Sequence, residues 1–262
     1  MPQHLTPLSF YNRRQQRLVG EILTPAESKG WAFISHGLGG SRAQPHMKLL
    51  ADCALAAGYT TVFFDHANSF GASGGALDQL TPTTHLHDLE DVIAHCEQQH
   101  KAEGQYLLMG HSLGSFAILH YAAHHPDKVA AIAPLSAVLG GEASWNAWQN
   151  ADPKAFADFH RVGTMPKPNS LNPSQVGQIS WNYITDLKHH DILKLAPQIT
   201  VPALLIVGAQ DRSTPVHTQL KLKQKLKGMV EKHIIPDCSH TFRAPEHLAG
   251  VREILSKWLD EL

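Results

Sequence analysis

Short apolar segments alternate with longer segments of helical periodicity along most of this 262-residue chain. The segment Thr60 to Asp65 is rich in β-branched and aromatic residues, as strands are, whereas Leu86 to Gln98 repeats apolar residues at helical spacing. Strands that alternate with helices of about ten to fifteen residues form βαβ units, in which each helix leads back to the start of the next parallel strand. The pattern therefore predicts an α/β protein with a mostly parallel sheet.

The predicted elements follow one another with short connections. Two strands, Leu5 to Tyr11 and Arg17 to Leu23, flank a polar turn and predict a hairpin at the start of the chain. We expect the later strands at Trp31 to Ser35, Thr60 to Asp65, Gln105 to Met109, Val129 to Leu135, Val201 to Val207 and Val230 to Ile235. We expect the helices at His46 to Ala57, Leu86 to Gln98, Leu113 to His124, His217 to Leu226 and Glu246 to Leu262.

One long segment interrupts this alternation. Between residues 137 and 197 there is no clear strand pattern, but there are several prolines and three of the five tryptophans. A loop of about sixty residues without structure is uncommon in a compact domain. We therefore interpret residues 137–197 as a helical cap, or lid, that is inserted over the sheet. Residues 1–136 and 198–262 then form the core domain.

The composition excludes several classes of protein. Hydrophobic residues make up 43% of the chain and charged residues 17%, whereas disordered chains combine low hydrophobicity with high charge. The formal net charge of −1 gives no basic surface for nucleic acid or for an anionic membrane. No apolar run approaches the ~18 residues of a membrane span. We therefore expect a globular chain without a nucleic-acid partner and without a membrane span.

The cysteines and the first residues bear on the cellular compartment. Cys53, Cys96 and Cys238 are far apart in the sequence and show no zinc-ligand spacing. Disulfide frameworks belong mainly to small secreted chains, so we interpret these residues as three reduced thiols. The segment that follows Met1 lacks the charged and then apolar pattern of a signal peptide. These features predict a cytoplasmic protein.

Nineteen histidines are many beside twenty-two lysines and arginines, and they raise the question of a metal site. His120 and His124 stand four residues apart and would share one face of a helix. No cysteine or glutamate stands near them at metal-ligand spacing, and the sequence contains no His-Glu-x-x-His motif. We therefore expect no metal ion, and we interpret most histidines as solvent-facing or hydrogen-bonded side chains.

Two segments match the pattern Gly-x-Ser-x-Gly, with Ser112 and Ser73 at their centres. A nucleophilic serine needs a sharp turn between a strand and a helix, because this turn lifts its hydroxyl above the edge of the sheet. Ser112 has this context, since a predicted strand ends at Met109 and a predicted helix begins at Leu113. No helical pattern follows Ser73, so we interpret its segment as a glycine-rich loop. The sequence therefore predicts Ser112 as the nucleophile.

A serine nucleophile needs a base that accepts its proton, and the base needs an acid that orients it. Asp211 and His240 each follow a predicted strand, so both lie in loops at the sheet edge that displays Ser112. The chain order of serine, aspartate and histidine is the one expected for this arrangement. We therefore predict a catalytic triad of Ser112, Asp211 and His240. Three further acids remain as alternatives for the orienting role: Asp237, Asp186 and Asp191.

Acyl transfer also needs hydrogen-bond donors for the oxyanion that develops in the transition state. The backbone N–H of Leu113, directly after the nucleophile, is one candidate. The glycine-rich segment His36 to Gly40 follows a predicted strand and offers the N–H of Leu38 as the second donor. His36 and His111 stand beside these positions, and we expect them to help shape the two loops.

Taken together, these blocks make the chain similar to the α/β-hydrolase superfamily over essentially its whole length. It resembles most closely the small bacterial carboxylesterases and acyl hydrolases with a cap between the sixth and seventh core strands, and feruloyl-esterase-like and monoacylglycerol-lipase-like members are near neighbours. The resemblance implies an α/β-hydrolase fold with an eight-stranded sheet, helices on both faces and no cofactor. The blocks that carry it are His36 to Gly40, Asp65 to Gly75, the Ser112 turn, Gly208 to Asp211 and Ser239-His240.

The resemblance also implies an activity, namely hydrolysis of carboxylic esters through an acyl-enzyme. The partner would be a small-molecule ester, and the chain a monomer or a homodimer. The same triad serves thioesterases, amidases and carbon–carbon hydrolases, and a non-catalytic ligand-binding module is a further alternative. In the family, an oxyanion loop of the type His-Gly-x, here with Leu38 at x, often goes with medium or longer acyl chains. We expect the cap to line the substrate pocket with Trp145, Trp148, Trp181 and Tyr183.

Overall fold

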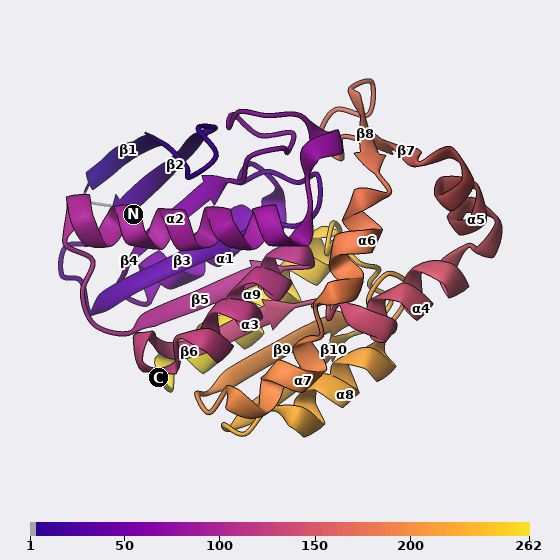
Figure 1. Cartoon of the computed structure of the whole chain (residues 1–262). Helices are drawn as coiled ribbons and strands as arrows, with labels where there is room; N and C mark the ends of the chain where they lie inside the picture. Colours follow the sequence, from indigo (N-terminus) through magenta and orange to yellow (C-terminus); the bar gives the residue numbers. More distant parts are fainter. Residues whose placement is uncertain (1–3) are drawn as a thin grey trace.

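The computed structural model describes residues 4–262, and an eight-stranded sheet forms its centre (Figure 1). The strands lie in the spatial order β1-β2-β4-β3-β5-β6-β9-β10. β1 pairs with β2 and β2 with β4 in antiparallel fashion, whereas the remaining neighbours are parallel. This confirms the predicted fold class. The bounds are β1 His4–Tyr11, β2 Arg17–Thr24, β3 Gly30–Ser35, β4 Tyr59–Asp65, β5 Tyr106–His111, β6 Val129–Leu135, β9 Ala203–Gly208 and β10 Val230–Ile235.

Helices cover both faces of this sheet, as expected. α2 (Pro82–His100), α3 (Leu113–His124) and α8 (Val216–Lys225) pack on one face, and α1 (Pro45–Ala56) and α9 (Pro245–Asp260) pack on the other. Between these two layers, β4, β5 and β9 are buried along their whole length. A parallel strand covered on both faces needs a continuous apolar run. This requirement explains why the core strands could be predicted from short apolar segments of the sequence.

The start of α2 differs from the prediction by four residues. Its first turn begins at Pro82, and not at Leu86, because Thr81 and Thr84 form a reciprocal capping box. The Thr84 N–H donates to Thr81 Oγ1 at 3.1 Å, and the Thr81 N–H donates to Thr84 Oγ1 at 2.9 Å. Pro82 occupies the first helical position, where its missing N–H costs nothing. Apolar periodicity overlooks this start because the first turn is polar.

We call residues 137–197, which connect β6 to β9, the insertion. Its hairpin β7–β8 contradicts our expectation that this segment has no strand. β7 is only five residues long and contains Pro166 and Pro168, which are unusual inside strands and hide its alternating pattern. That alternation leaves Met165 and Lys167 on the less exposed side of β7. The insertion comprises α4 Gly141–Ala151, α5 Pro153–Val162, β7 Thr164–Pro168, β8 Val176–Ser180, α6 Asn182–His189 and α7 Ile192–Leu195, and a short 3₁₀ turn, Ala196–Gln198, marks its end.

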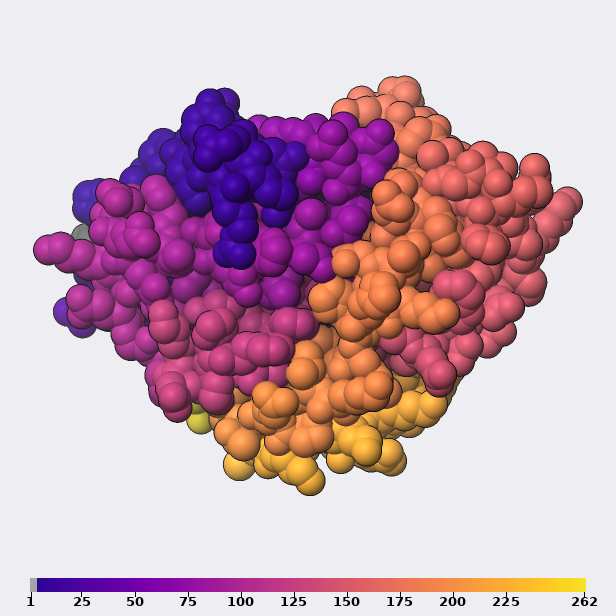
Figure 2. All heavy atoms as spheres, in the orientation of Figure 1, coloured from indigo at the N-terminus to yellow at the C-terminus, as the bar shows by residue number. Residues whose placement is uncertain are grey.

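The insertion lies beside the sheet (Figures 1 and 2), and two of its contacts with the core fix its position near the glycine-rich loop and α2. In Figure 2 its orange part runs down the face of the molecule from the hairpin to the C-terminal region. Asp186 of α6 accepts the backbone N–H of Thr83 at 2.7 Å and its hydroxyl at 2.8 Å. In the other contact, Gln44 Nε2 donates to Ser170 Oγ in the hairpin loop at 2.8 Å. These bonds fix the insertion over the N-terminal end of α2 and beside the glycine-rich loop.

We expect Asp186→Asn to weaken the attachment of the insertion. Burial raises the pKa of Asp186, but hydrogen bonds from His190 and Thr83 outweigh it and lower the pKa to about 2. A lowered folded-state pKa stabilises the fold above the unfolded value near ~3.9, and this contribution is lost as the pH falls toward the folded value. The variant should therefore lose about 1–2 kcal/mol of unfolding free energy at pH 7, and the difference should shrink between pH 4 and pH 2.

Urea unfolding at several pH values measures this difference. Asp158→Asn is the matched control, because Asp158 forms an exposed ion pair with Arg161 within α5, and such pairs contribute less than about 0.5 kcal/mol. Equal losses in the two variants, or a difference for Asp186→Asn that stays constant down to pH 3, would contradict the proposed attachment.

Candidate active site

Ser112 occupies the sharp turn between β5 and α3. Its φ of +57° lies in the left-handed region, which residues other than glycine seldom adopt. Its backbone N–H donates to the carbonyl of Leu135 at 2.9 Å, and its own carbonyl accepts the N–H groups of Phe116 and Val138, each at 3.2 Å. Because both sides of the peptide are bonded, the surrounding structure maintains the strained conformation. Ser112 thus has the strand–turn–helix context that the sequence predicted.

Three glycines allow the chain to pack this closely around the turn. A β-carbon on Gly110 would lie 2.6 Å from the carbonyl carbon of Gly114, and one on Gly114 would overlap the carbonyl oxygen of Ser35. A β-carbon on Gly37, in the glycine-rich loop, would lie 3.0 Å from Cβ of Ser112. The absent side chains therefore let α3 begin against β3, and they bring the glycine-rich loop into contact with the serine.

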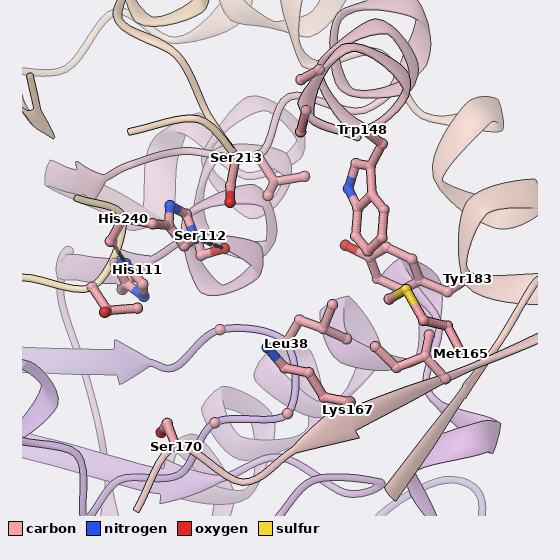
Figure 3. A pocket seen from close by; sticks show the side chains of 18 of the residues that line it. Leu38, His111, Ser112, Trp148, Met165, Lys167, Ser170, Tyr183, Ser213 and His240 are labelled. Atoms are coloured by element: carbon pink, nitrogen blue, oxygen red, sulfur yellow. Dashed lines mark hydrogen bonds between the residues drawn. The ribbon is translucent and has the colours of Figure 1, made fainter. Parts of the chain in front are cut away.

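Ser112, His240 and Asp211 form one hydrogen-bonded chain. Ser112 Oγ lies 2.9 Å from His240 Nε2 (Figure 3), and His240 Nδ1 lies 2.9 Å from Asp211 Oδ2. A proton on Nδ1 that points at the carboxylate leaves Nε2 as an acceptor for the serine hydroxyl. The structure thus brings together the three predicted side chains from the loops that follow β5, β9 and β10.

Asp211 is buried and held in its charged form. Its Oδ1 accepts the backbone N–H groups of Ser213 and Thr214 at 2.9 Å each, and its Oδ2 accepts the Thr214 hydroxyl at 2.7 Å. Burial raises the pKa of Asp211, but the hydrogen bond and charge of His240, together with the donors of Thr214, lower it well below its usual range. The sequence analysis missed Thr214. Thr214 stands three residues after Asp211, and an aspartate often accepts hydrogen bonds from the turn that follows it. This spacing is the sequence signal by which Thr214 could have been found.

The three alternative acids have other roles in the structure. Asp186 binds the first turn of α2, and Asp191 caps α7 through its side chain. Asp237 lies close to His240 in the sequence, but its Oδ1 is 3.4 Å from the side-chain amide of a neighbouring glutamine. Among the described residues, Asp211 is the acid within hydrogen-bond distance of the His240 ring.

Ser73, the centre of the second Gly-x-Ser-x-Gly segment, holds a loop together. Its hydroxyl donates to the carbonyl of Asp65 at 2.5 Å and accepts the N–H of Val19 at 2.8 Å. The first bond joins the loop to the end of β4, and the second joins it to the neighbouring strand β2. The position of Ser73 agrees with its interpretation as a loop residue.

His111 connects the serine turn to the loop of His240. Its Nε2 donates to the backbone carbonyl of His240 at 2.7 Å. Burial above all, and then the neighbouring His46 and His240, lower the pKa of His111 well below its usual value, so the ring stays neutral. His36 has a comparable place on the other loop, where its Nε2 accepts the N–H of His66 at 2.9 Å. Both residues support the loops that the sequence analysis expected them to shape.

The two predicted oxyanion donors flank Ser112. Leu113 is the first residue of α3, and the first N–H groups of a helix have no acceptor within it. Leu38 follows Gly37, the glycine that lies against the Ser112 side chain. Neither Leu38 nor Leu113 donates a backbone hydrogen bond within residues 4–262. Both N–H groups are therefore available to a ligand at the serine.

A cavity of about 340 Å³ opens beside Ser112 and His240. Leu38 and the glycine-rich loop form one side of it, and Figure 3 shows Trp148 and Tyr183 across the cavity from the serine. The aromatic and aliphatic side chains exclude water from the space next to the nucleophile and leave it suited to an apolar group. The largest apolar side chains that the insertion contributes to the cavity wall are Trp148, Phe156, Phe159, Met165, Ile179 and Tyr183.

Trp145 and Trp181 do not line this cavity, contrary to our prediction. The Trp181 ring packs against Phe156 and Phe159, with centroids 5.3 and 5.0 Å away, and Trp145 lies edge-on to Phe156 at 5.0 Å. The two tryptophans thus support the cavity wall from behind. Large aromatic residues were recognisable in the sequence, but the packing of α5 and β7 decides which of them face the cavity. Met165 and Ile179 were missed because their hairpin was missed.

Several histidines form a buried cluster behind the glycine-rich loop. The rings of His66 and His85 stack with centroids 3.4 Å apart, and His66 Nε2 lies 2.7 Å from Ser35 Oγ. Burial is the main cause that lowers the pKa of both histidines well below the usual value, so they are neutral. No group of three or more histidine, cysteine, aspartate or glutamate side chains in residues 4–262 is arranged to hold a metal ion.

Sequence comparison relates the chain to known hydrolases. The family model described as "alpha/beta hydrolase fold" matches residues 33–168. The chain is 23% identical over 224 residues to bovine (Bos taurus) "Palmitoyl-protein thioesterase ABHD10, mitochondrial". The aligned stretch covers 86% of this chain and 70% of that protein. Over a shorter stretch of 84 residues the chain is 38% identical to a pyrethroid hydrolase from Sphingobium wenxiniae. This stretch covers 32% of this chain and 28% of that protein.

These comparisons leave the cellular location open. The name of the thioesterase relatives places those proteins in mitochondria, and the cytoplasmic location of this chain stays a prediction. Within residues 4–262, no helix combines the length and the apolar character that a membrane crossing requires.

Solved structures resemble the whole chain. Mouse ABHD10 superposes with a TM-score of 0.77 at 18% identity, covering 98% of this chain and 99% of that one. Est1E from Butyrivibrio proteoclasticus with bound ferulic acid gives a TM-score of 0.76 at 19% identity, covering 97% and 98%. At such identities the likeness shows the fold. Because the family model itself spans more than half of the sequence, this chain belongs to the α/β hydrolase family.

Proposed function

We propose that this chain is a serine hydrolase that cleaves small carboxylic esters through an acyl-enzyme. One observation carries the proposal. The hydrogen-bonded chain from Asp211 through His240 to Ser112 ends at an apolar cavity, where two backbone N–H groups are unengaged. Nucleophile, base, orienting acid and oxyanion donors are the parts that acyl transfer requires.

In the first half of the reaction, His240 Nε2 accepts the proton of Ser112 as Oγ attacks the ester carbonyl. The N–H groups of Leu38 and Leu113 bind the resulting oxyanion. Asp211, which stays ionised, keeps the proton of the neutral ring on Nδ1 and stabilises the imidazolium. The imidazolium then donates its Nε2 proton to the leaving alcohol, which leaves the acyl group bound to Ser112 Oγ.

In the second half, water takes the place of the alcohol. His240 accepts a proton from this water, whose oxygen attacks the acyl carbonyl, and the same two N–H groups bind the second oxyanion. The collapse of this intermediate releases the carboxylic acid and returns the proton to Ser112 Oγ. The bond from His111 to the carbonyl of His240 holds the histidine loop in place through both halves.

A thioester is the second candidate substrate. Relatives that align with 84–86% of this chain carry the name palmitoyl-protein thioesterase. The same serine and oxyanion donors attack a thioester carbonyl, and the apolar wall of the cavity accepts an acyl chain in either case. A panel of p-nitrophenyl esters and matched acyl thioesters of increasing chain length compares the two classes directly. The monomeric or homodimeric state predicted from the resemblance stays a prediction.

Ser112→Ala should lower kcat for p-nitrophenyl ester hydrolysis by roughly 10⁶ if the serine is the nucleophile. Ser73→Ala is the matched control, since Ser73 occupies the other Gly-x-Ser-x-Gly segment and bonds only loop and strand backbone. Steady-state kinetics of the two purified variants, with thermal unfolding to confirm their fold, distinguish the serines. Retained hydrolysis in Ser112→Ala would overturn the assignment.

Asp211→Asn should lower kcat by roughly 10³–10⁴, because an amide no longer selects the His240 tautomer whose Nε2 accepts the serine proton. Asp237→Asn changes the neighbouring acid that is exposed and has no bond to the histidine ring. Its kcat should stay within about twofold of the unsubstituted protein. The same kinetic assay measures both, and the reverse order of effects would assign the orienting role to Asp237.

Trp148→Ala should shift the acyl preference toward longer or bulkier chains, because it removes a ring from the cavity wall. We expect about a tenfold change in the kcat/KM ratio between dodecanoyl and butanoyl esters, the size of effect that a hydrophobic pocket provides. Trp145→Ala removes a ring behind the wall, so it should lower Tm and alter that ratio less. Equal changes of the ratio in both variants would argue that neither ring contacts the acyl chain.

A further inference from the structure

Two cationic side chains line the cavity beside Ser112 without a counter-charge. Lys167 comes from β7 of the insertion, and Arg243 comes from the loop that follows His240. Within residues 4–262, no carboxylate oxygen lies within 4.0 Å of either cation. Two parts of the chain that are far apart in sequence thus place positive charge around one small cavity.

The stem of Lys167 lies on the glycine-rich loop. A β-carbon on Gly39 would be 3.4 Å from Cγ and 3.5 Å from Cε of Lys167, so the side chain passes directly over this glycine. Figure 3 shows Lys167 extending from its strand toward Leu38, on the same side of the cavity. The Lys167 side chain therefore lies beside the loop that offers an oxyanion donor, at the wall of the cavity.

Holding these charges together is unfavourable for the protein without a ligand. Burial, and then the charge of Arg243, lower the pKa of Lys167 from its usual value. Lys167 is half-buried whereas Arg243 is exposed, and a cation that is partly removed from water is stabilised chiefly by an opposite charge. The remaining carboxylate of the lining, Asp152, accepts the backbone N–H of Ala155 at 2.9 Å as the cap of α5 and does not reach the cations.

The other titratable groups of the lining do not balance the cations. His111 is neutral, since burial lowers its pKa, and burial raises the pKa of Tyr183 well above its usual value, so its hydroxyl keeps its proton. With Lys167 and Arg243 charged and Asp152 ionised, the lining carries a net positive charge next to its apolar wall. Such a combination of apolar surface and unpaired cations fits a ligand that has both an apolar part and an anionic end.

We propose that Lys167 and Arg243 select esters that carry an anionic oxygen group, a carboxylate or a phosphate, close to the scissile bond. This proposal rests on the proposed ester hydrolysis, since it names the substrate class of the same site. The cations bind the anionic end of the substrate, and the aromatic wall of the insertion contacts its apolar part. Their positions on β7 and after His240 place this recognition on both sides of the nucleophile.

A matched pair of substrates tests the proposal. Mono-p-nitrophenyl adipate ends in a carboxylate, and p-nitrophenyl methyl adipate has the same acyl chain with that carboxylate methylated. The protein should show a kcat/KM at least about tenfold higher for the carboxylate ester, the ratio expected of a close charge pair. A p-nitrophenyl ester of 5-phosphonopentanoate replaces the carboxylate with a phosphonate. Comparing its kcat/KM with that of the carboxylate ester, each relative to the methyl ester, shows which anionic group the cations prefer.

Variants then assign the preference to the cations. Lys167→Met and Arg243→Met should each lower the ratio of kcat/KM between the carboxylate and methyl esters about tenfold, whereas Lys167→Arg should retain most of it. Lys154→Met is the control, because Lys154 is an exposed lysine of α5 outside the cavity lining. A ratio near one for the unsubstituted protein, or a ratio that Lys167→Met leaves unchanged, would overturn the proposal.

A binding measurement separates this proposal from the proposed hydrolysis. Adipate should raise the Tm of the Ser112→Ala protein more than dimethyl adipate does, and the Lys167→Met substitution in that background should abolish the difference. If neither ester is hydrolysed but adipate binds in this way, the proposed function fails and the anion site stands. If the esters are hydrolysed but adipate and its dimethyl ester shift Tm equally, the anion site fails and the hydrolase stands.

Discussion

The close approach of α3 to β3 is the constraint on which the rest of the site depends. It requires bare backbone at Gly110 and Gly114, and it holds Ser112 in a left-handed conformation that its own chemistry does not favour. The cost is offset by the hydrogen bonds of the turn and by the apolar packing of α3, which is buried on nearly every side. Because the turn is rigid, a histidine and a loop N–H supplied by other strands can meet the hydroxyl at hydrogen-bond distance.

The second constraint is that the sheet edge alone offers little apolar surface around the serine. The insertion supplies it, and its attachment determines where the surface lies. Asp186 fixes α6 to the first turn of α2, and the bond from Gln44 to Ser170 fixes the hairpin loop beside the glycine-rich loop. The oxyanion loop and the cavity wall are thereby held by the same contact, so a movement of the hairpin would change the shape of the cavity and the position of Leu38 together.

Much of the core and the three predicted triad residues could be read from the sequence, because each carries a local signal. Buried parallel strands are continuous apolar runs, and Ser112 and Asp211 each follow such a run, whereas His240 follows the edge strand β10 of mixed polarity. The insertion is different. Its hairpin contains prolines, and whether Trp145 or Trp148 faces the cavity depends on how α5 packs against α4. Thr214 and Lys167 were missed for the same reason, since their importance lies in a neighbour that is distant in sequence or in the register of a strand that was not predicted.

The proposed cation pair also bears on which kinetic constant the anionic group would change. In the proposal, the ammonium pairs with the anionic end of the substrate and not with the carbonyl oxygen that reacts. This ion pair forms before the reaction and persists in the transition state, so it stabilises the bound complex and the transition state about equally. The buried histidines beside the serine turn do not replace the ammonium, since burial lowers the pKa of His46 to about 3 and that of His111 well below its usual range. The preference for an anionic ester therefore belongs mainly in KM, and the gain in kcat/KM comes from binding.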